Sequence, residues 1–366
     1  MSNFSYDYLG ENTNSRRLKK INMKQYITIH LSFKVMILSI FSIFVIGCSI
    51  HQTTEKRISL PYDIIIDSVF SGSVGDLIYT GKYIVWKDLK NAPFLHIVDP
   101  EKKMEIASVG TFGQGPDEFV SPMLKPYNED TVLICELNSM KQRLIALNRI
   151  NTNDFLVEMP DLTSNIITDN KVYVDNKSVI YYSFNIPEKP FLYVCGSDTV
   201  PFGHHPLNQN YCVYPNNKSN LLYNNSKDVL LCYFGSIPYI SIYHKSGTGF
   251  RLIKEIFSEI DYTVDDAIVK YHSDIHGPTN MALLKDFIVS SEYDYESGDE
   301  FVSTQNPNQF VRPHSVFVRD YDGHLITVVD IGVPIRSIAG NESGNMLYLV
   351  VINPEFQLIK LDLNTI

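Results

Sequence analysis

Histidine side chains offer the clearest opportunity for metal or acid–base chemistry in this chain, and they cluster at two places. His204 and His205 are adjacent, whereas His272 and His276 are four residues apart. Two histidines at the second spacing share one face of a helix and could ligate a metal ion together. A Gly-Pro pair follows His276 at once, and proline is poorly tolerated inside a helix. We therefore predict exposed loop histidines and no metal site.

Carboxylates form two further clusters. The segment Asp320-Tyr-Asp322-Gly323 resembles part of a calcium-binding loop, but no glutamate follows at the required spacing, so we predict a hairpin turn. Five carboxylates lie close together in a long insertion: Glu292, Asp294, Glu296, Asp299 and Glu300. Paired acids can perform general acid–base catalysis, but a solvated acidic loop is far commoner. No G-x-S-x-G nucleophile motif is present, so the sequence identifies no catalytic residue and no cofactor.

Cys48 offers a different chemistry, covalent attachment of lipid. Six basic residues precede an apolar run of about 13 residues, Val35–Gly47, which is typical of an export signal and shorter than the ~20 residues of a membrane-spanning helix. The last four residues, Val45-Ile-Gly-Cys48, resemble the bacterial lipobox, in which a thiol carries the diacylglycerol thioether. We predict a lipoprotein signal at 1–47, with Met23 as an alternative start, and lipid attachment at Cys48. A plain signal peptide or a short signal anchor are the alternatives.

Four other cysteines follow, at positions 135, 195, 212 and 232. Each lies in or beside an apolar run, and no CxxC pair occurs, which argues against a zinc site. An oxidising compartment permits disulfides, for which Cys195 and Cys212 are the best-placed pair. We predict that these cysteines are buried thiols, although the sequence leaves the disulfide state open.

The exported part of the chain is acidic. Removal of residues 1–47 takes away six basic and two acidic side chains from totals of 31 and 41, which leaves 25 against 39 and a net charge of −14. Such a body repels phosphate backbones and anionic lipid headgroups. We therefore predict no nucleic-acid binding, and membrane attachment through acyl chains only.

Short strands must position all of these residues. From Ile58 onward no long amphipathic helix is apparent, and Tyr (23) and Phe (20) are abundant, which favours strands. The chain repeats a pattern of apolar strands separated by polar loops and tight turns, in copies spaced roughly 45–60 residues apart. Repeating units of this size with four strands are typical of propeller blades. We predict a tether at 48–57 and an all-β, six-bladed β-propeller of four-stranded antiparallel blades at 58–366.

The sixth copy lacks its outermost strand, because the chain ends after the run at 356–361. An uncovered strand edge there would leave backbone donors and acceptors exposed. The strand-like segment 62–70 belongs to no copy, so we predict that it pairs with the last strand and closes the ring. The alternatives are two tandem β-sandwiches, or a seventh blade built from 257–281.

One segment carries a family resemblance. Gly113-Gln-Gly115-Pro116-Asp-Glu118-Phe119 resembles the G-x-G-P-x-E-F signature of TolB-like six-bladed β-propeller lipoproteins of Gram-negative bacteria. In that family the signature follows the outer strand of the first blade, as it does here. The family is largely uncharacterised, so the resemblance implies a fold and a location but no reaction.

We interpret this signature loop (110–122) as structural. Gly113 and Gly115 permit positive φ or close backbone approach, and Pro116 fixes the turn. Glu118 is placed to accept backbone N–H bonds, and Phe119 to fill the gap between two blades. Phosphate binding by the loop is less well supported, because no helix follows and no basic residue lies in the signature.

Binding is therefore the function that the sequence favours. The long segments 203–227, 257–281 and 291–314 are rich in Tyr, Asn, His and Asp, and propeller rims suit recognition. We predict a lipid-anchored envelope protein that faces the periplasm from the outer membrane and binds protein partners or glycans without catalysis. The alternative is an envelope hydrolase or lyase that acts on polysaccharide or peptide at the channel.

Overall fold

The computed structural model divides the chain into two compact units, 1–54 and 55–366. It describes residues 56–366 apart from 70, 137–140, 153, 160–169, 176, 184–187, 207–218, 259–261, 266–267, 272–274 and 300–311. Cys48, Cys212, His272 and Glu300 therefore lie outside the described residues. Within the described part no helix has the length and apolarity needed to cross a bilayer. The helical turns there are η1 (Leu147–Arg149) and η6 (Leu363–Thr365).

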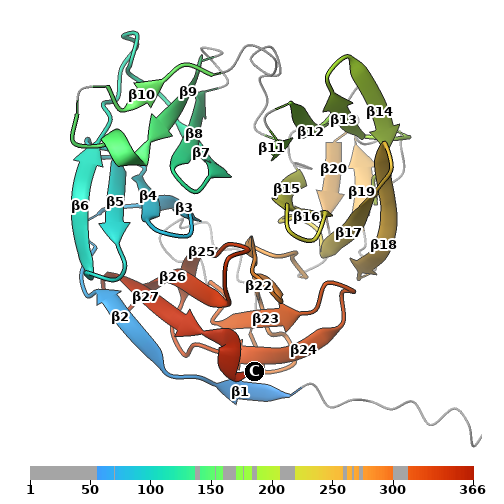
Figure 1. The fold of residues 1–366 in the computed structure, drawn as a ribbon. Helices are drawn as coiled ribbons and strands as arrows, with labels where there is room; N and C mark the ends of the chain where they lie inside the picture. Colours follow the sequence, from blue (N-terminus) through green and yellow to red (C-terminus); the bar gives the residue numbers. More distant parts are fainter. Residues whose placement is uncertain are drawn as a thin grey trace, which may run out of the picture. The chain divides into compact units, whose positions relative to one another are not determined.

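The second unit is a ring of six antiparallel sheets, or blades (Figure 1). Blade 1 contains β3 (Val74–Tyr79), β4 (Ile84–Asp88), β5 (Leu95–Asp99) and β6 (Met104–Val109). Blade 2 contains β7 (Met123–Asn128), β8 (Thr131–Glu136), β9 (Lys141–Ala146) and β10 (Leu156–Val157). Blade 3 contains β11 (Lys171–Asp175), β12 (Ser178–Tyr182), β13 (Phe191–Cys195) and β14 (Asp198–Phe202). Blade 4 contains β15 (Ser219–Asn224), β16 (Val229–Phe234), β17 (Tyr239–Ser246) and β18 (Gly249–Phe257).

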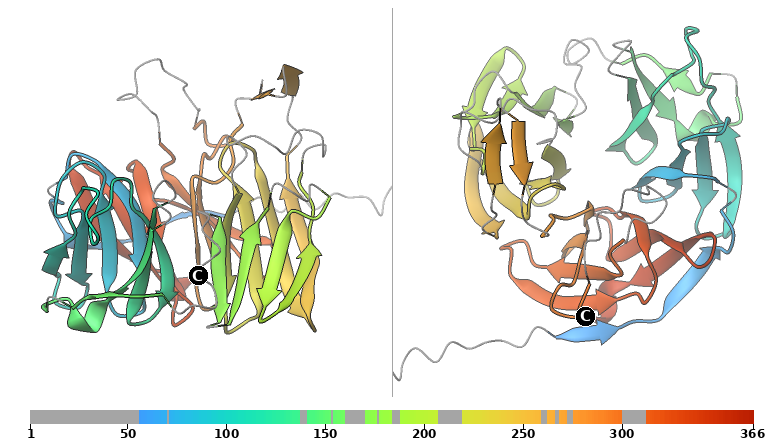
Figure 2. Two further views of the ribbon diagram at one scale, coloured as in Figure 1. Left: turned by 90° about the horizontal axis from the view of Figure 1, so that it is seen from above. Right: turned by 180° about the vertical axis from the view of Figure 1, so that it is seen from behind.

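Blades 5 and 6 use strands from both ends of the unit. Blade 5 contains β21 (Asn280–Leu283), β22 (Ile288–Glu292), β23 (Ser315–Arg319) and β24 (Leu325–Asp330), with β1 (Arg57–Ser59) at its edge. Blade 6 contains β25 (Ile335–Ala339), β26 (Met346–Ile352), β27 (Phe356–Asp362) and β2 (Tyr62–Ile66). Between β18 and β21 the described residues form one hairpin, β19 (Tyr262–Asp265) and β20 (Ile268–Tyr271), which lies to one side of the blades (Figure 2). The six-bladed prediction is thus confirmed, and the described residues form neither tandem sandwiches nor a seventh blade.

Tight turns join the two outer strands of blades 4 and 5 as the sequence predicts. Gly247 connects β17 to β18 with φ of 59°, and Gly323 connects β23 to β24 with φ of 84°. Positive φ is strained for residues with a Cβ, so glycine at these positions lets the two strands fold back directly. The segment at 320–323 is accordingly the predicted hairpin turn.

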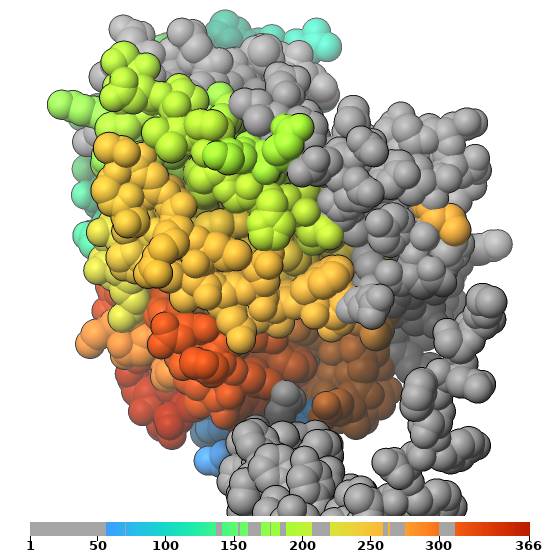
Figure 3. Space-filling model, turned by 90° about the vertical axis from the view of Figure 1, so that its right-hand side faces the viewer, coloured from blue at the N-terminus to red at the C-terminus, as the bar shows by residue number. Residues whose placement is uncertain are grey.

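Six apolar clusters, one at each contact between neighbouring blades, hold the ring together. Each cluster draws buried side chains from two consecutive blades, and the cluster between blades 6 and 1 completes the circuit. Blades 3, 4 and 5 are visible side by side in Figure 3, in green, yellow and orange. Counting only residues that the structure describes, the blade 2–3 cluster has the fewest buried members: Leu133, Leu144, Met159, Tyr173 and Val179. Both faces of every blade are buried, so each blade depends on two neighbours.

The first and last strands of the ring lie in one sheet. β2 pairs antiparallel with β27, with Tyr62 opposite Leu361 and Asp63 opposite Lys360. This is the pairing that the sequence predicts for 62–70 with 356–361, although the strand ends earlier, at Ile66. The edge of β27 is therefore covered, and the backbone groups there have partners in the sheet.

The strand β1 adds an element that the sequence does not predict. It pairs in parallel with β24, with Arg57 opposite Val328, and the carbonyl of Lys56 accepts hydrogen bonds from the N–H of Val328 (3.0 Å) and the hydroxyl of Thr327 (2.6 Å). Lys56 and Arg57, which we expected in the tether, take part in the sheet. Three residues carry too short a pattern to be recognised as a strand, and a parallel partner leaves no turn signal nearby.

Cysteines at paired positions test the contact between the two ends. The double variant Asp63→Cys/Lys360→Cys should form a disulfide, because directly opposed residues in an antiparallel pair have Cα atoms about 4.5–5.5 Å apart. Non-reducing peptide mapping should recover the linked peptides, and the bridge should raise stability by about 2–4 kcal/mol. Asp63→Cys/Glu355→Cys, whose second position lies outside the pairing, is the control. Equal cross-linking in both variants would contradict the register.

Candidate binding site

A cavity lies at one end of the channel that the six innermost strands surround. Its volume is about 330 Å³. Every blade contributes residues of its innermost strand, and in most blades these are its last residues or the turn that follows. The lining segments are 77–80, 126–129, 172–173, 222–225, 281–283 and 338–343. A site of this kind exists only when all six blades are assembled, because no blade supplies more than a fraction of its wall.

Aromatic rings form part of this wall. The rings of Tyr127 and Tyr173 meet edge to face across the blade 2–3 contact, with centroids 5.1 Å apart. Tyr79 lies 4.5 Å from the ring of Tyr348, and its hydroxyl donates to the carbonyl of Gly81 at 2.8 Å. Burial raises the pKa of both Tyr79 and Tyr127. These phenols are therefore neutral near pH 7 and present uncharged aromatic surfaces.

Amides and carboxylates complete the wall. The Asn224 amide donates to the Tyr321 hydroxyl at 2.6 Å, and its oxygen accepts from the Ser226 hydroxyl at 2.7 Å. Glu342 accepts from the N–H of Ser226 at 3.0 Å and, with Glu129, is one of two charged residues in the lining. Three further asparagines face the cavity: Asn128, Asn225 and Asn341. Among the described lining residues none is basic, so the cavity suits a neutral or cationic group.

The cavity lies at the end of the ring that we did not expect. Two of the three long segments, 203–227 and 257–281, lead into innermost strands. The third, 291–314, joins the second strand of blade 5 to the third. The described ends of all three therefore lie where the innermost strands begin. The cavity lies where those strands end, beside short turns. Much of each long segment is outside the described residues. The sequence signal that could have located the cavity is a Tyr or Asn that recurs at the end of an innermost strand, as at Tyr127 and Tyr223.

The signature loop lies between blades 1 and 2, after β6. The Glu118 carboxylate accepts the N–H of Gly115 at 2.8 Å, the type of contact expected from the sequence. A Cβ at Gly113 would overlap this carboxylate, so close approach rather than positive φ explains the glycine. Lys141 of blade 2 donates to the carbonyls of Gly115 (2.7 Å) and Glu118 (2.6 Å). A basic residue thus reaches the loop, and it donates to backbone carbonyls of the loop itself.

The far side of the same loop is anchored by buried groups. Phe119 is 1% exposed and belongs to the apolar cluster between blades 1 and 2. Glu136, also 1% exposed, accepts the N–H groups of Val120 (2.7 Å) and Ser121 (2.5 Å). Lys87 donates to the carbonyl of Pro122 at 2.7 Å. These contacts fasten the loop to both blades.

The histidine and cysteine predictions are partly wrong. His204 is exposed and lies 2.6 Å from Glu255, but His205 is buried against the ring of Phe234, with centroids 5.0 Å apart. Cys135 and Cys232 are buried as predicted, whereas Cys195, at the end of β13, is an exposed free thiol. An apolar run does not reveal which of its residues points outward, since alternate side chains of a strand face opposite ways.

Of the two carboxylate clusters, the first is the hairpin turn that the sequence predicts. Asp320, Asp322 and His324 bring one ligand atom each within 4.8 Å of one another; Asp322 and His324 are exposed, and the half-buried Asp320 accepts the N–H groups of Asp322 and His324. In the 292–300 insertion Glu292 pairs with Arg319 at 2.7 Å. The insertion is therefore not simply a solvated loop.

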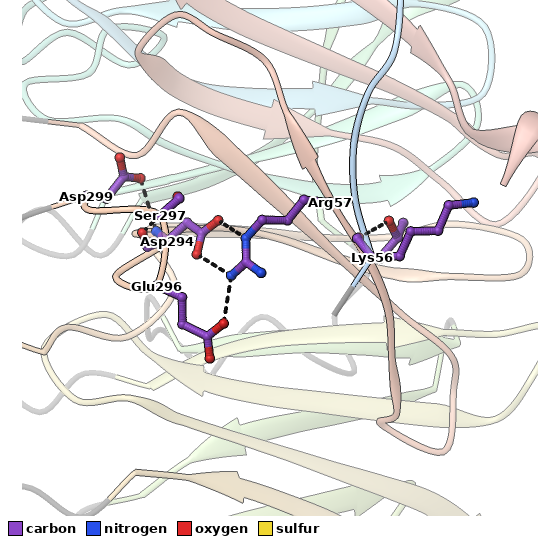
Figure 4. A network of polar contacts seen from close by, with 7 residues as sticks. Lys56, Arg57, Asp294, Glu296, Ser297 and Asp299 are labelled. Atoms are coloured by element: carbon purple, nitrogen blue, oxygen red, sulfur yellow. Dashed lines mark hydrogen bonds and ion pairs between the residues drawn. The ribbon is translucent and has the colours of Figure 1, made fainter. Parts of the chain in front are cut away.

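Asp294 of this insertion is bound by the first strand of the unit (Figure 4). Arg57 of β1 donates to both Asp294 oxygens at 2.9 Å, and also to Glu296 at 2.9 Å. Asp294 is 3% exposed, and the Arg57 hydrogen bonds hold its pKa below the usual value. A second cavity of about 480 Å³ beside this contact also includes Asp299 and His314 in its lining. The bidentate pair fixes β1 to blade 5.

Comparison with solved structures supports the fold. A Bacteroides fragilis protein described as exported matches with a TM-score of 0.53 and 9% identity, covering 83% of this chain and 97% of that one. Regucalcin, a calcium-binding protein from Agrobacterium tumefaciens, matches with a TM-score of 0.46 and 9% identity, covering 84% and 95% of the two chains. No protein-family model matches the chain, and no curated protein matches its sequence. At these identities the similarity is one of fold alone.

Phe119 provides a test of the contact between blades 1 and 2. Phe119→Ala should lower the free energy of unfolding by about 3–5 kcal/mol, because it empties a buried aromatic site. Denaturant unfolding of the purified protein measures the change. The neighbouring Val120 is 54% exposed, so Val120→Ala is the matched control and should change stability by less than about 0.5 kcal/mol. Equal losses in the two variants would show that the loop does not join the blades.

Proposed function

We propose that this protein is a lipid-anchored binding protein of the cell envelope, which holds a ligand in the cavity at the end of its channel. The observation that carries the proposal is the composition of that cavity. Four tyrosines (Tyr79, Tyr127, Tyr173 and Tyr223), four asparagines and two glutamates line it. Tyrosine rings stack on apolar faces of ligands, and amides satisfy hydroxyl or peptide groups, so a glycan or a peptide segment fits this chemistry.

The cavity favours binding over catalysis. Its titratable side chains are tyrosines and the glutamates Glu129 and Glu342, and Glu342 already accepts a backbone N–H. Glu129 is exposed. General acid–base catalysis requires a titratable group that is held against the substrate. An exposed glutamate and a glutamate that accepts a backbone N–H do not form such an arrangement, so we favour binding.

The envelope location rests on the sequence. The basic stretch, the apolar run and the Val45–Cys48 lipobox resemblance support acylation at Cys48, and the signature 113–119 resembles that of TolB-like propeller lipoproteins. We propose attachment to the outer membrane with the propeller facing the periplasm.

Metabolic labelling tests the anchor. In a Gram-negative host the wild-type protein should incorporate an alkyne fatty acid and sediment with membranes, because the acyl chains are its proposed membrane contact. Cys48→Ser should abolish the label and release the protein. Cys195→Ser removes an exposed thiol from β13 and should keep both properties. Labelling of Cys48→Ser would exclude this residue as the attachment site.

Ligand screening tests the cavity. Full-length protein should be probed with arrays of neutral glycans and of peptides, and the best ligand titrated by calorimetry. Tyr127→Ala and Asn225→Ala should each weaken binding, the tyrosine about 10-fold or more, because each removes part of the wall. Tyr181→Ala changes a half-buried tyrosine of β12 that does not line the cavity, and should bind normally. Unchanged affinity in both cavity variants would exclude this site, and turnover of the ligand would contradict a purely binding role.

A further inference from the structure

Two arginines lie together at the other end of the channel. Arg336 is on β25, the innermost strand of blade 6, near the point where that strand begins. Arg312 precedes β23, and the carbonyl of the next residue, Pro313, accepts the N–H of Ile335 at 2.9 Å. This backbone bond brings 312–313 alongside 335–336. Both arginine side chains are half-buried.

Neither arginine has a carboxylate within hydrogen-bond distance among the residues that the structure describes. Burial, followed by repulsion from Arg312, lowers the pKa of Arg336, while Asp76 acts in the opposite direction. Burial also lowers the pKa of Arg312. Asp76 itself pairs with Lys87 at 2.8 Å and accepts the N–H of Leu124 at 3.1 Å. Its charge is therefore already shared.

A second pair of cations lies on the innermost strands of blades 2 and 3. Lys125 and Tyr127 share one face of β7, and Lys171 and Tyr173 share one face of β11. Since the two tyrosine rings meet at 5.1 Å, the two lysines lie on facing sides of the same contact. Burial lowers the pKa of Lys171 to about 8, with a further lowering contribution from Lys125. Lys171 is 1% exposed and donates to the Gln142 side-chain oxygen, so its charge lies between blades 2 and 3.

We propose that Arg312 and Arg336 form an anion-binding site at the end of the channel opposite the tyrosine-lined cavity, for a carboxylate or phosphate group of a small ligand. A guanidinium presents donors in a planar fork that matches both groups. A bound anion would replace mutual repulsion between the arginines by attraction to both. The site is separate from the tyrosine-lined cavity, so the two proposals stand or fall independently.

The size of the ligand follows from the charge distribution. An extended polyanion would have to contact the outer surface of a body with net charge −14, where repulsion dominates. A small anion beside the arginines is close to two positive charges and farther from most of the negative ones. Because the interaction weakens with distance and is screened by salt, the attraction to the arginines is the stronger effect. A sugar acid or a phosphorylated small molecule meets this requirement, and both present the same chemistry to Arg312 and Arg336.

Binding of two simple anions tests the proposal. Full-length protein in detergent should be titrated by calorimetry with inorganic phosphate and with glucuronate, at constant ionic strength. We expect wild-type protein to bind at least one of them, and Arg312→Gln and Arg336→Gln each to weaken that binding about 10-fold or more. Arg251→Gln changes an exposed arginine on β18 and should bind as wild type does. The stronger ligand identifies the preferred anionic group.

Stability without ligand separates an anion site from a structural role. If the arginines repel each other, Arg336→Gln should unfold at the same or a higher temperature than wild type in the absence of anion. Arg336→Lys keeps the charge but loses the fork, and should bind more tightly than Arg336→Gln and more weakly than wild type. Lack of binding to either anion would overturn the proposal, and so would equal binding by wild type and both glutamine variants. An Arg336→Gln protein that unfolds at a lower temperature than wild type in the absence of anion would also overturn it, because the arginine would then have a structural role.

Discussion

The burial of both faces of every blade is the constraint on which the rest of the structure depends. Each four-stranded sheet places apolar side chains on its two sides, and each side packs against a different neighbour. A linear array of such sheets would leave two apolar faces in water, at a cost of about 25 cal/mol for each Å² exposed. The ring removes both faces at once, and the pairing of β2 with β27 joins the beginning and the end of the unit in one sheet.

The blade contacts are not equal, and the difference has a chemical reason. Among the described residues, the contact between blades 2 and 3 has the smallest apolar cluster. It also contains Lys171, which is 1% exposed and donates to the Gln142 side-chain oxygen. A buried cation opposes assembly unless its donors are satisfied. The contact between blades 5 and 6, by comparison, is built from a long series of branched aliphatic side chains. Among the described residues, the contact between blades 2 and 3 is therefore the more polar of the two.

The sequence predicts the repeated elements well because each is encoded locally. Alternating apolar residues give the strands, and glycines such as Gly247 and Gly323 give the turns. The pairing of β2 with β27 could be predicted because the last repeat lacks an outer strand and an exposed strand edge needs a partner. Side-chain partners across the ring are not encoded locally: Arg57 and Asp294 are 237 residues apart, so their bidentate pair carries no pattern that a single sequence reveals. The cavity escaped prediction for the same reason, since its wall comes from six separated strands.

The net charge of the chain does not predict where its individual charged residues lie. The residues that follow Gly47 carry a net charge of −14, which predicts that the protein repels extended polyanions. Composition does not say where the remaining cations are placed, however. Arg312, Arg336, Lys125 and Lys171 come from four different blades and lie on or beside elements at the inner part of the ring. Because an interaction between charges weakens with distance and is screened by salt, a small anion close to Arg312 and Arg336 responds more strongly to these two charges than to the distributed net charge.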